Sequence, residues 1–117
     1  MIAPLIGETA SCVCHHCQNI YQLFSLFMDK HFNITIWGLV QGVWYRGSAQ
    51  QQARSLGLTG FVQNLPDGGV YAEAEGPEAV LFEFVKWCRR GPELAKVDEV
   101  QVTEDAVLGF ADFAIRR

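Results

Sequence analysis

The sequence predicts an α+β domain in which two helices cover one face of an antiparallel sheet. Three observations support this class: short segments that alternate like strands, two segments with helical spacing of apolar residues, and glycine or proline at their junctions. The chain has 117 residues, 50% of them hydrophobic, which suits one domain with a filled core. Residues 1–27 contain one charged residue, Glu8, so the composition changes near residue 28. We therefore expect an N-terminal extension over residues 1–27 and a single domain over residues 28–117.

The first half of the expected domain contains a strand, a loop and a helix. Residues 31–37 alternate between apolar and polar side chains, which predicts a strand with one apolar face. A loop with three glycines, residues 38–47, follows this strand. Residues 48–57 predict a helix, because apolar residues recur at helical spacing and Gly57 can adopt the left-handed conformation that ends a helix.

The second half contains a hairpin, a helix and further extended segments. Asp67, Gly68 and Gly69 tolerate positive φ and predict a tight turn between two strands. The later helix has one apolar stripe and basic residues in its last turn. The expected elements are strands over residues 59–66, 70–76 and 97–104, a helix between Pro77 and Gly91, and a short last strand or extended tail over residues 110–117.

This order of elements, β-α-β-β-α-β, is that of the ferredoxin-like sandwich. In that topology the first two strands run parallel and the third lies between them, so their carboxyl ends share one edge of the sheet. Arg46 follows the first strand and Asn64 lies near the end of the second. The topology is therefore expected to bring Arg46 and Asn64 toward each other.

The loop after the first strand has the features of an anion site. Gly38 and Gly42 allow a tight loop whose backbone N–H groups point into one concavity, and the following helix adds its positive end. Arg46 adds a planar guanidinium that matches phosphate oxygens. Taken alone, the same pattern also fits a tight turn with a solvated arginine. The expected phosphate-binding residues are Gln41, Gly42, Val43, Trp44, Tyr45 and Arg46.

Two stretches, GLVQGVWYR at residues 38–46 and GFVQNLPDGGVYAEAEG at residues 60–76, together resemble the two signatures of the acylphosphatase family. The resemblance covers roughly residues 30–117. It implies the ferredoxin-like fold and hydrolysis of the carboxyl-phosphate bond of small acyl phosphates, with no cofactor. It also implies that Arg46 and the loop amides bind the phosphoryl group and that Asn64 orients the attacking water. No side chain of the motifs is a nucleophile, which fits direct attack by water.

Composition narrows the possible partners and the location. The formal charge of −4 argues against a general nucleic-acid binder, which normally has a basic face. The chain has no apolar run as long as a membrane span and no positive N-terminal region typical of a signal peptide, so we expect a cytoplasmic protein that binds no membrane. We also expect a monomer. Two alternatives to a free-standing acylphosphatase remain: an accessory domain that handles carbamoyl phosphate, and a non-catalytic ferredoxin-like binding module.

Several other residues have chemistry that could serve a role. Five potential zinc ligands near the N-terminus lie too close together for a standard structural site, so no metal is assigned; they are Cys12, Cys14, His15, His16 and Cys17. Cys88 is expected in the core and His31 in solvent. Trp37 has the phase of the open sheet face, and Trp44 either lines the pocket or packs beside it.

The segment before Met28 is expected to be dispensable for folding and activity. The alternative is that its apolar residues dock on the open sheet face as a helical patch. These residues are Ile20, Tyr21, Leu23, Phe24, Leu26 and Phe27.

Overall fold

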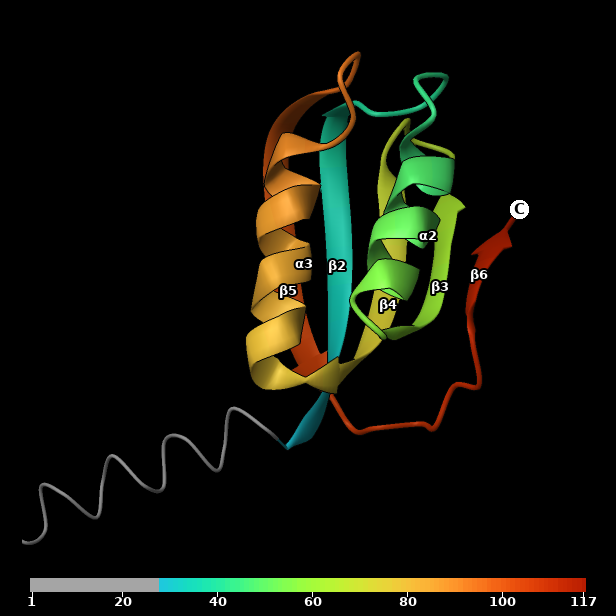
Figure 1. Cartoon of the computed structure of the whole chain (residues 1–117). Coiled ribbons are helices and arrows are strands. Elements are labelled where there is room, and N and C mark those ends of the chain that lie inside the picture. Colours follow the sequence, from blue (N-terminus) through green and yellow to red (C-terminus); the bar gives the residue numbers. More distant parts are fainter. Residues whose placement is uncertain (1–27) are drawn as a thin grey trace, which may run out of the picture.

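A computed structural model describes residues 28–117 as one five-stranded sheet with two helices on one face (Figure 1). The extension over residues 1–27, with its Cys and His cluster and its apolar patch, lies outside the described residues. The elements are β2 (Asp29–Leu39), α2 (Tyr45–Ser55), β3 (Thr59–Asn64), β4 (Val70–Pro77), α3 (Glu78–Arg90), β5 (Lys96–Asp105) and β6 (Phe113–Arg116).

The strand order is β5-β2-β4-β3-β6. β2 and β3 each pair antiparallel with β4, so they run parallel to each other with β4 between them, as the sequence predicted. The last strand differs from the expected antiparallel sheet, because β6 pairs parallel with β3 and the sheet is mixed. The connection between β5 and β6 crosses one end of the sheet to its far edge, so β6 starts at the same end as β3 (Figure 1). The carboxyl ends of β2, β3 and β6 therefore lie at the same end of the sheet.

The core lies between the sheet and the two helices. Ala49 and Ala53 are small enough to let α2 approach the sheet closely, and both are buried. The expected stripe of α3 is also buried, and Cys88 is a core residue with 1% of its surface exposed, as predicted. The largest fully buried side chains are Tyr45, Phe84, Phe113, Ile34, Ile36, Leu81, His31, Val40, Val62, Val70 and Cys88.

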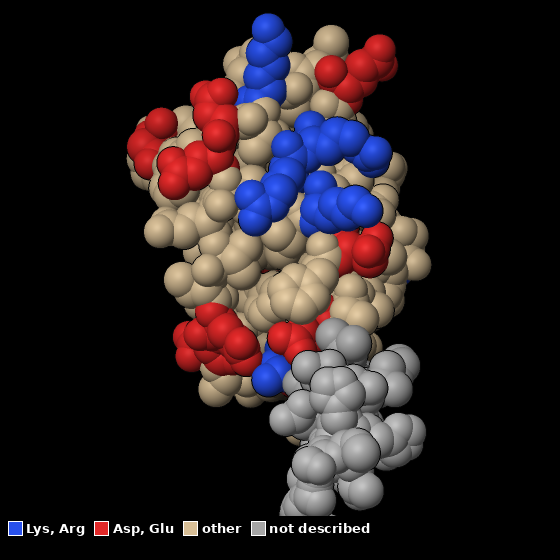
Figure 2. Space-filling view, turned by 90° about the vertical axis from the view of Figure 1, so that its left-hand side faces the viewer, with Lys and Arg blue, Asp and Glu red and all other residues tan. Residues whose placement is uncertain are grey.

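The side formed by α3 and β5 carries much of the basic charge. Figure 2 shows Lys and Arg side chains gathered in its upper half, with acidic side chains around them. Arg89 and Arg90 lie in the last turn of α3, where the negative end of the helix dipole favours cations. None of the helices within residues 28–117 is long and apolar enough to span a membrane.

His31 corrects one expectation from the sequence, because it is buried and not solvated. Its side chain is 1% exposed and that of Glu75 5%, although both lie on the sheet face without helices. His31 Nδ1 and Glu75 Oε2 are 2.6 Å apart, and Glu75 also accepts the backbone N–H groups of Leu108, Gly109 and Phe110. The β5–β6 connection thus covers this end of the face, with the Phe110 ring 5.8 Å from that of His31.

The contacts of this pair favour its charged form. Burial lowers the pKa of His31, but hydrogen bonds to Glu75 and Asn33 and the nearby carboxylates outweigh burial and raise it. Burial raises the pKa of Glu75, whereas the His31 bond and the three backbone N–H groups lower it by more. Farther along β2, Trp37 has the predicted open-face phase; it is half-buried, and its indole N–H points to Asp67 Oδ2 at 3.4 Å.

Candidate active site

The loop between β2 and α2 turns through two left-handed residues. Gly42 has φ 76° and Trp44 has φ 65°. α2 therefore begins at Tyr45, three residues earlier than the sequence predicted. Within the described part of the chain no side chain caps this helix start, and its first turn contains no acidic residue. The positive end of the helix dipole is thus left without a neutralising side chain, as an anion site requires.

Gln41 ties this loop to the β3–β4 hairpin. Its side-chain amide donates to the carbonyl oxygens of Leu65 at 2.7 Å and Gly69 at 2.8 Å. Gln41 was expected to contribute a backbone amide to phosphate binding, and its side chain adds a positioning role that the sequence reasoning missed. The signal was one polar amide between apolar neighbours in the motif VQGV. Because Leu65 follows Asn64, the bond fixes the loop relative to Asn64.

Tyr45 anchors the start of α2 to the end of α3. Its hydroxyl donates to the Cys88 carbonyl oxygen at 2.7 Å, and its ring lies 5.4 Å from that of Trp87. Burial raises the pKa of Tyr45 well above its usual range, so the hydroxyl stays protonated at ordinary pH. A Cβ on Gly91 would approach the Tyr45 ring to 2.9 Å, so a glycine is needed at this point of contact.

Arg46 and Asn64 line the same cavity, as the topology predicted. The cavity has a volume of about 730 Å³ and lies at the end of the sheet where β2, β3 and β6 terminate. Most of the expected phosphate loop contributes to it, although Gln41 does not. The lining residues are Val40, Gly42, Val43, Trp44, Tyr45, Arg46, Gly47, Asn64, Leu94, Ile115 and Arg117.

The side chains of Arg46 and Asn64 are held differently. Arg46 Nη1 donates to the carbonyl oxygen of Arg116 in β6 at 3.1 Å, which uses one of five guanidinium N–H donors. Asn64 Oδ1 is buried and has no hydrogen-bond partner among residues 28–117. A buried acceptor without a partner costs about 1–3 kcal/mol, so Asn64 Oδ1 is an unusual group in this structure.

Three lining residues lie far from the glycine loop in the sequence and were not predicted: Leu94, Ile115 and Arg117. Leu94 lies in the connection from α3 to β5, and Ile115 reaches the cavity because β6 pairs with β3. No local sequence pattern indicates that Leu94 or Ile115 lines a site. Trp44, whose place the sequence left open, both lines the cavity and packs against Gly47.

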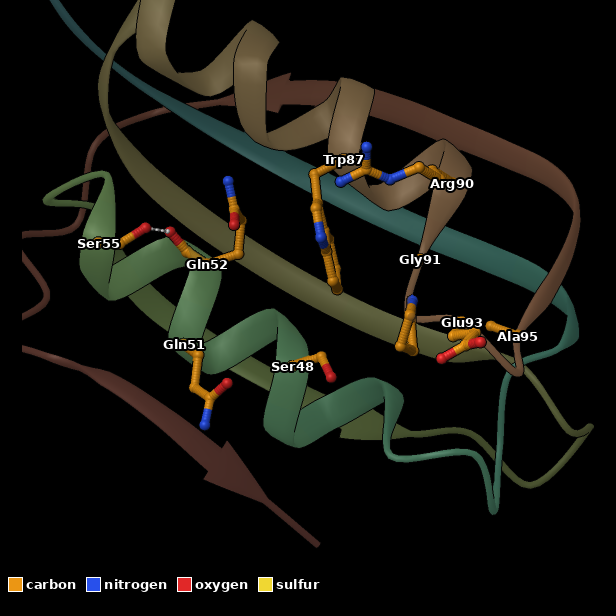
Figure 3. A pocket seen from close by; sticks show the side chains of 10 residues that line it. Ser48, Gln51, Gln52, Ser55, Trp87, Arg90, Gly91, Glu93 and Ala95 are labelled. Carbon is orange, nitrogen blue, oxygen red and sulfur yellow. Dashed lines mark hydrogen bonds between the residues drawn. The ribbon is translucent and has the colours of Figure 1, made fainter.

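A second cavity, of about 800 Å³, lies between the outer surfaces of α2 and α3 (Figure 3). Trp87 stands between the two helices there, with Gln52 and Ser48 on α2 and Arg90 on α3. This cavity contains neither Arg46 nor Asn64. We therefore place the candidate active site in the cavity at the glycine loop, although the other one is slightly larger.

Comparison with known proteins agrees with this geometry. The family model described as Acylphosphatase matches residues 32–115. An acylphosphatase of Methylococcus capsulatus is 51% identical over 89 residues, which are 75% of this chain and 97% of the relative. The crystal structure of acylphosphatase from Bacillus subtilis is 38% identical with a TM-score of 0.73, over 77% of this chain and all of that one. The chain belongs to the acylphosphatase family.

A structure of full-length HypF in a phosphate- and nucleotide-bound form is also similar. It is 32% identical with a TM-score of 0.70, over 77% of this chain but 12% of the HypF chain. The same fold is thus found in proteins of similar length to this domain and as a small part of a much longer one. The family and the fold that the two motifs indicated are both confirmed.

Proposed function

We propose that this acylphosphatase hydrolyses small acyl phosphates by direct attack of water on phosphorus. Membership of the family supports the activity. The observation that supports the mechanism is one cavity that combines the Arg46 guanidinium, an uncapped helix start and the unpartnered Asn64 oxygen. The first two groups suit an anion, and the third suits a water molecule.

This reaction needs few catalytic groups because an acyl phosphate carries a good leaving group. The departing carboxylate is stable without protonation, so no strong general acid is needed. Phosphoryl transfer depends mainly on positioning and on electrostatic stabilisation. In the proposal, Arg46 and the backbone N–H groups from Gln41 to Arg46 bind the phosphoryl oxygens and stabilise their charge in the transition state. Asn64 accepts a hydrogen bond from water and aims it in line.

The proposed step balances without a further reactant. The water oxygen forms a bond to phosphorus while the bond from phosphorus to the bridging oxygen breaks. The bridging oxygen leaves with that electron pair as part of the carboxylate. One water proton moves to a phosphoryl oxygen, and the products are a carboxylate and dihydrogen phosphate.

Hydrolysis in ¹⁸O-labelled water tests this mechanism. Attack on phosphorus places the label in the released phosphate and leaves the carboxylate unlabelled. Label in the carboxylate would show attack on carbon, and a trapped phosphorylated protein would show a side-chain nucleophile. Either result would contradict the roles given to Arg46 and Asn64.

An accessory domain that handles carbamoyl phosphate is the second candidate, because the fold also occurs as a small part of a much longer chain. Both functions use the same phosphoryl site, so comparing turnover of carbamoyl phosphate and acetyl phosphate distinguishes them. We also propose that the protein acts as a monomer in the cytoplasm. Size-exclusion chromatography with light scattering tests the monomer, and cell fractionation tests the location.

A further inference from the structure

The cavity is larger than the phosphoryl group requires. Its volume of about 730 Å³ falls within the range of about 300–1,000 Å³ for pockets that bind small molecules. A water molecule takes about 30 Å³, and a phosphoryl group takes a few times as much. Most of the space is therefore left for the rest of the substrate, which in an acyl phosphate is the acyl group.

Trp44 is held in an unusual position at this cavity. It is 69% exposed, and its backbone has a left-handed φ of 65°, which is uncommon for a bulky residue. Its ring lies on Gly47, where an added Cβ would come within 2.4 Å of the ring atom Cε2. Strained backbone of this kind is found mainly at functional sites. Because Gly47 has no side chain, the indole ring can pack directly against its backbone.

Two further apolar side chains line the same cavity from other parts of the chain. Leu94, in the α3–β5 connection, is 73% exposed, and Ile115 of β6 is 38% exposed. We call Trp44, Leu94 and Ile115 the acyl wall. Single exposed apolar residues are ordinary on a protein surface, but three around one cavity indicate a binding surface.

We propose that the acyl wall selects acyl phosphates with an aromatic acyl group over those with a short or charged one. The inference rests on the proposed function and names the substrate class of that site. An aromatic ring can pack against the indole in an offset or edge-to-face arrangement and cover Leu94 and Ile115. An acetyl group is too small to cover this surface. Arg117 is the one lining residue besides Arg46 with a formal charge, and it is the group that would bind a free carboxylate on the acyl group.

The test compares phenylacetyl phosphate with acetyl phosphate, because both carry a saturated carbon next to the carbonyl and differ in the ring. The readout is the ratio of their kcat/KM values, since changes at the phosphoryl end act on both substrates. Trp44→Asn removes the indole, and asparagine tolerates the left-handed backbone. We expect the parent to prefer phenylacetyl phosphate and the variant to reduce that preference about 10-fold, the scale of a lost apolar pocket contact.

Gly47→Ala provides a second route to the same effect, because the new Cβ displaces the indole ring. It should lower the ratio in the parent and change it less than 2-fold in the Trp44→Asn background. Leu94→Asn should lower the ratio as well. Leu108→Asn is the matched control: Leu108 is a similarly exposed leucine, at 68%, in the connection at the other end of the sheet, so both kcat/KM values should stay unchanged.

Three results would overturn the inference. The first is a ratio that stays within 2-fold of the parent in both Trp44→Asn and Gly47→Ala. The second is a parent that prefers succinyl phosphate to phenylacetyl phosphate, which would assign selection to Arg117. The third is a parent that hydrolyses no acyl phosphate, which would remove the proposed function itself; the first two leave it intact.

Discussion

Glu75→Gln should destabilise the fold strongly without affecting the active site. The Glu75 carboxylate is 5% exposed and accepts hydrogen bonds from His31 and from three backbone N–H groups of the β5–β6 connection. Glutamine has the same shape but only one acceptor oxygen, and its amide N–H groups would face other donors. His31 would also lose one of its two carboxylate partners, while Glu73 Oε1 stays 3.1 Å from its Nε2.

The expected loss of stability is about 3 kcal/mol, at the lower end of the cost of breaking a buried ion pair. For a domain of this size that corresponds to a fall in Tm of about 12–24 °C. Thermal unfolding followed by circular dichroism, with urea unfolding as a second measurement, gives both values. The kcat at 25 °C should stay near that of the parent, because His31 lies near the start of β2 with Glu75 opposite it on β4. At about 3.3 Å per residue, this pair is about 25 Å from the glycine loop at the end of β2.

Glu104→Gln is the matched control for this substitution. Glu104 Oε2 lies 3.4 Å from Lys30 Nζ, and the glutamate side chain is 51% exposed. An exposed pair of this kind contributes about 0–1 kcal/mol. If Glu75→Gln lowers Tm no more than Glu104→Gln does, the buried pair does not hold the connection in place and the reasoning from burial and hydrogen bonding is wrong.

Four further predictions concern catalysis, pH and the N-terminal segment. Arg46→Lys should lower kcat/KM for acetyl phosphate about 100-fold, because lysine lacks the planar fork, and near-normal turnover would exclude the proposed role. Asn64→Ala should lower kcat about as much while inhibition by inorganic phosphate stays within a few-fold; loss of phosphate binding would instead make Asn64 a ligand-binding residue. The pKa of His31 is raised, so its stabilising contribution is complete below pH 6.5 and is lost as pH rises through its folded-state pKa. The pKa of Glu75 is lowered, so its contribution is complete above pH 4.5 and is lost as pH falls through its folded-state pKa; Tm measured against pH should be highest between these values, and a Tm that keeps rising above pH 8 would contradict this. A chain that starts at Met28 should keep its activity and a Tm within a few degrees of the full chain, and a fall of about 10 °C or more would show that residues 1–27 contribute to the fold.

Local patterns determined the elements and half of the candidate site. Alternation and helical spacing indicate which face of a segment is apolar, and these faces are as predicted in β2 and α3. The order of the elements then set the parallel course of β2 and β3, which brings Arg46 and Asn64 to one cavity. These predictions succeed because each depends on neighbours a few residues apart or on the topology of one common unit.

Tertiary structure decided what covers each face. His31 was expected in solvent, but its burial with Glu75 depends on the β5–β6 connection, which is distant in sequence and has no periodic pattern. The parallel pairing of β6 follows from the path of that same connection, and it brings Ile115 to the cavity. The position of Trp44 depends on its backbone conformation and on the open space above Gly47. Sequence spacing indicates local geometry, whereas burial and the lining of a site depend on which distant segments pack together. In this protein, that packing brings the residues of the acyl wall to the cavity.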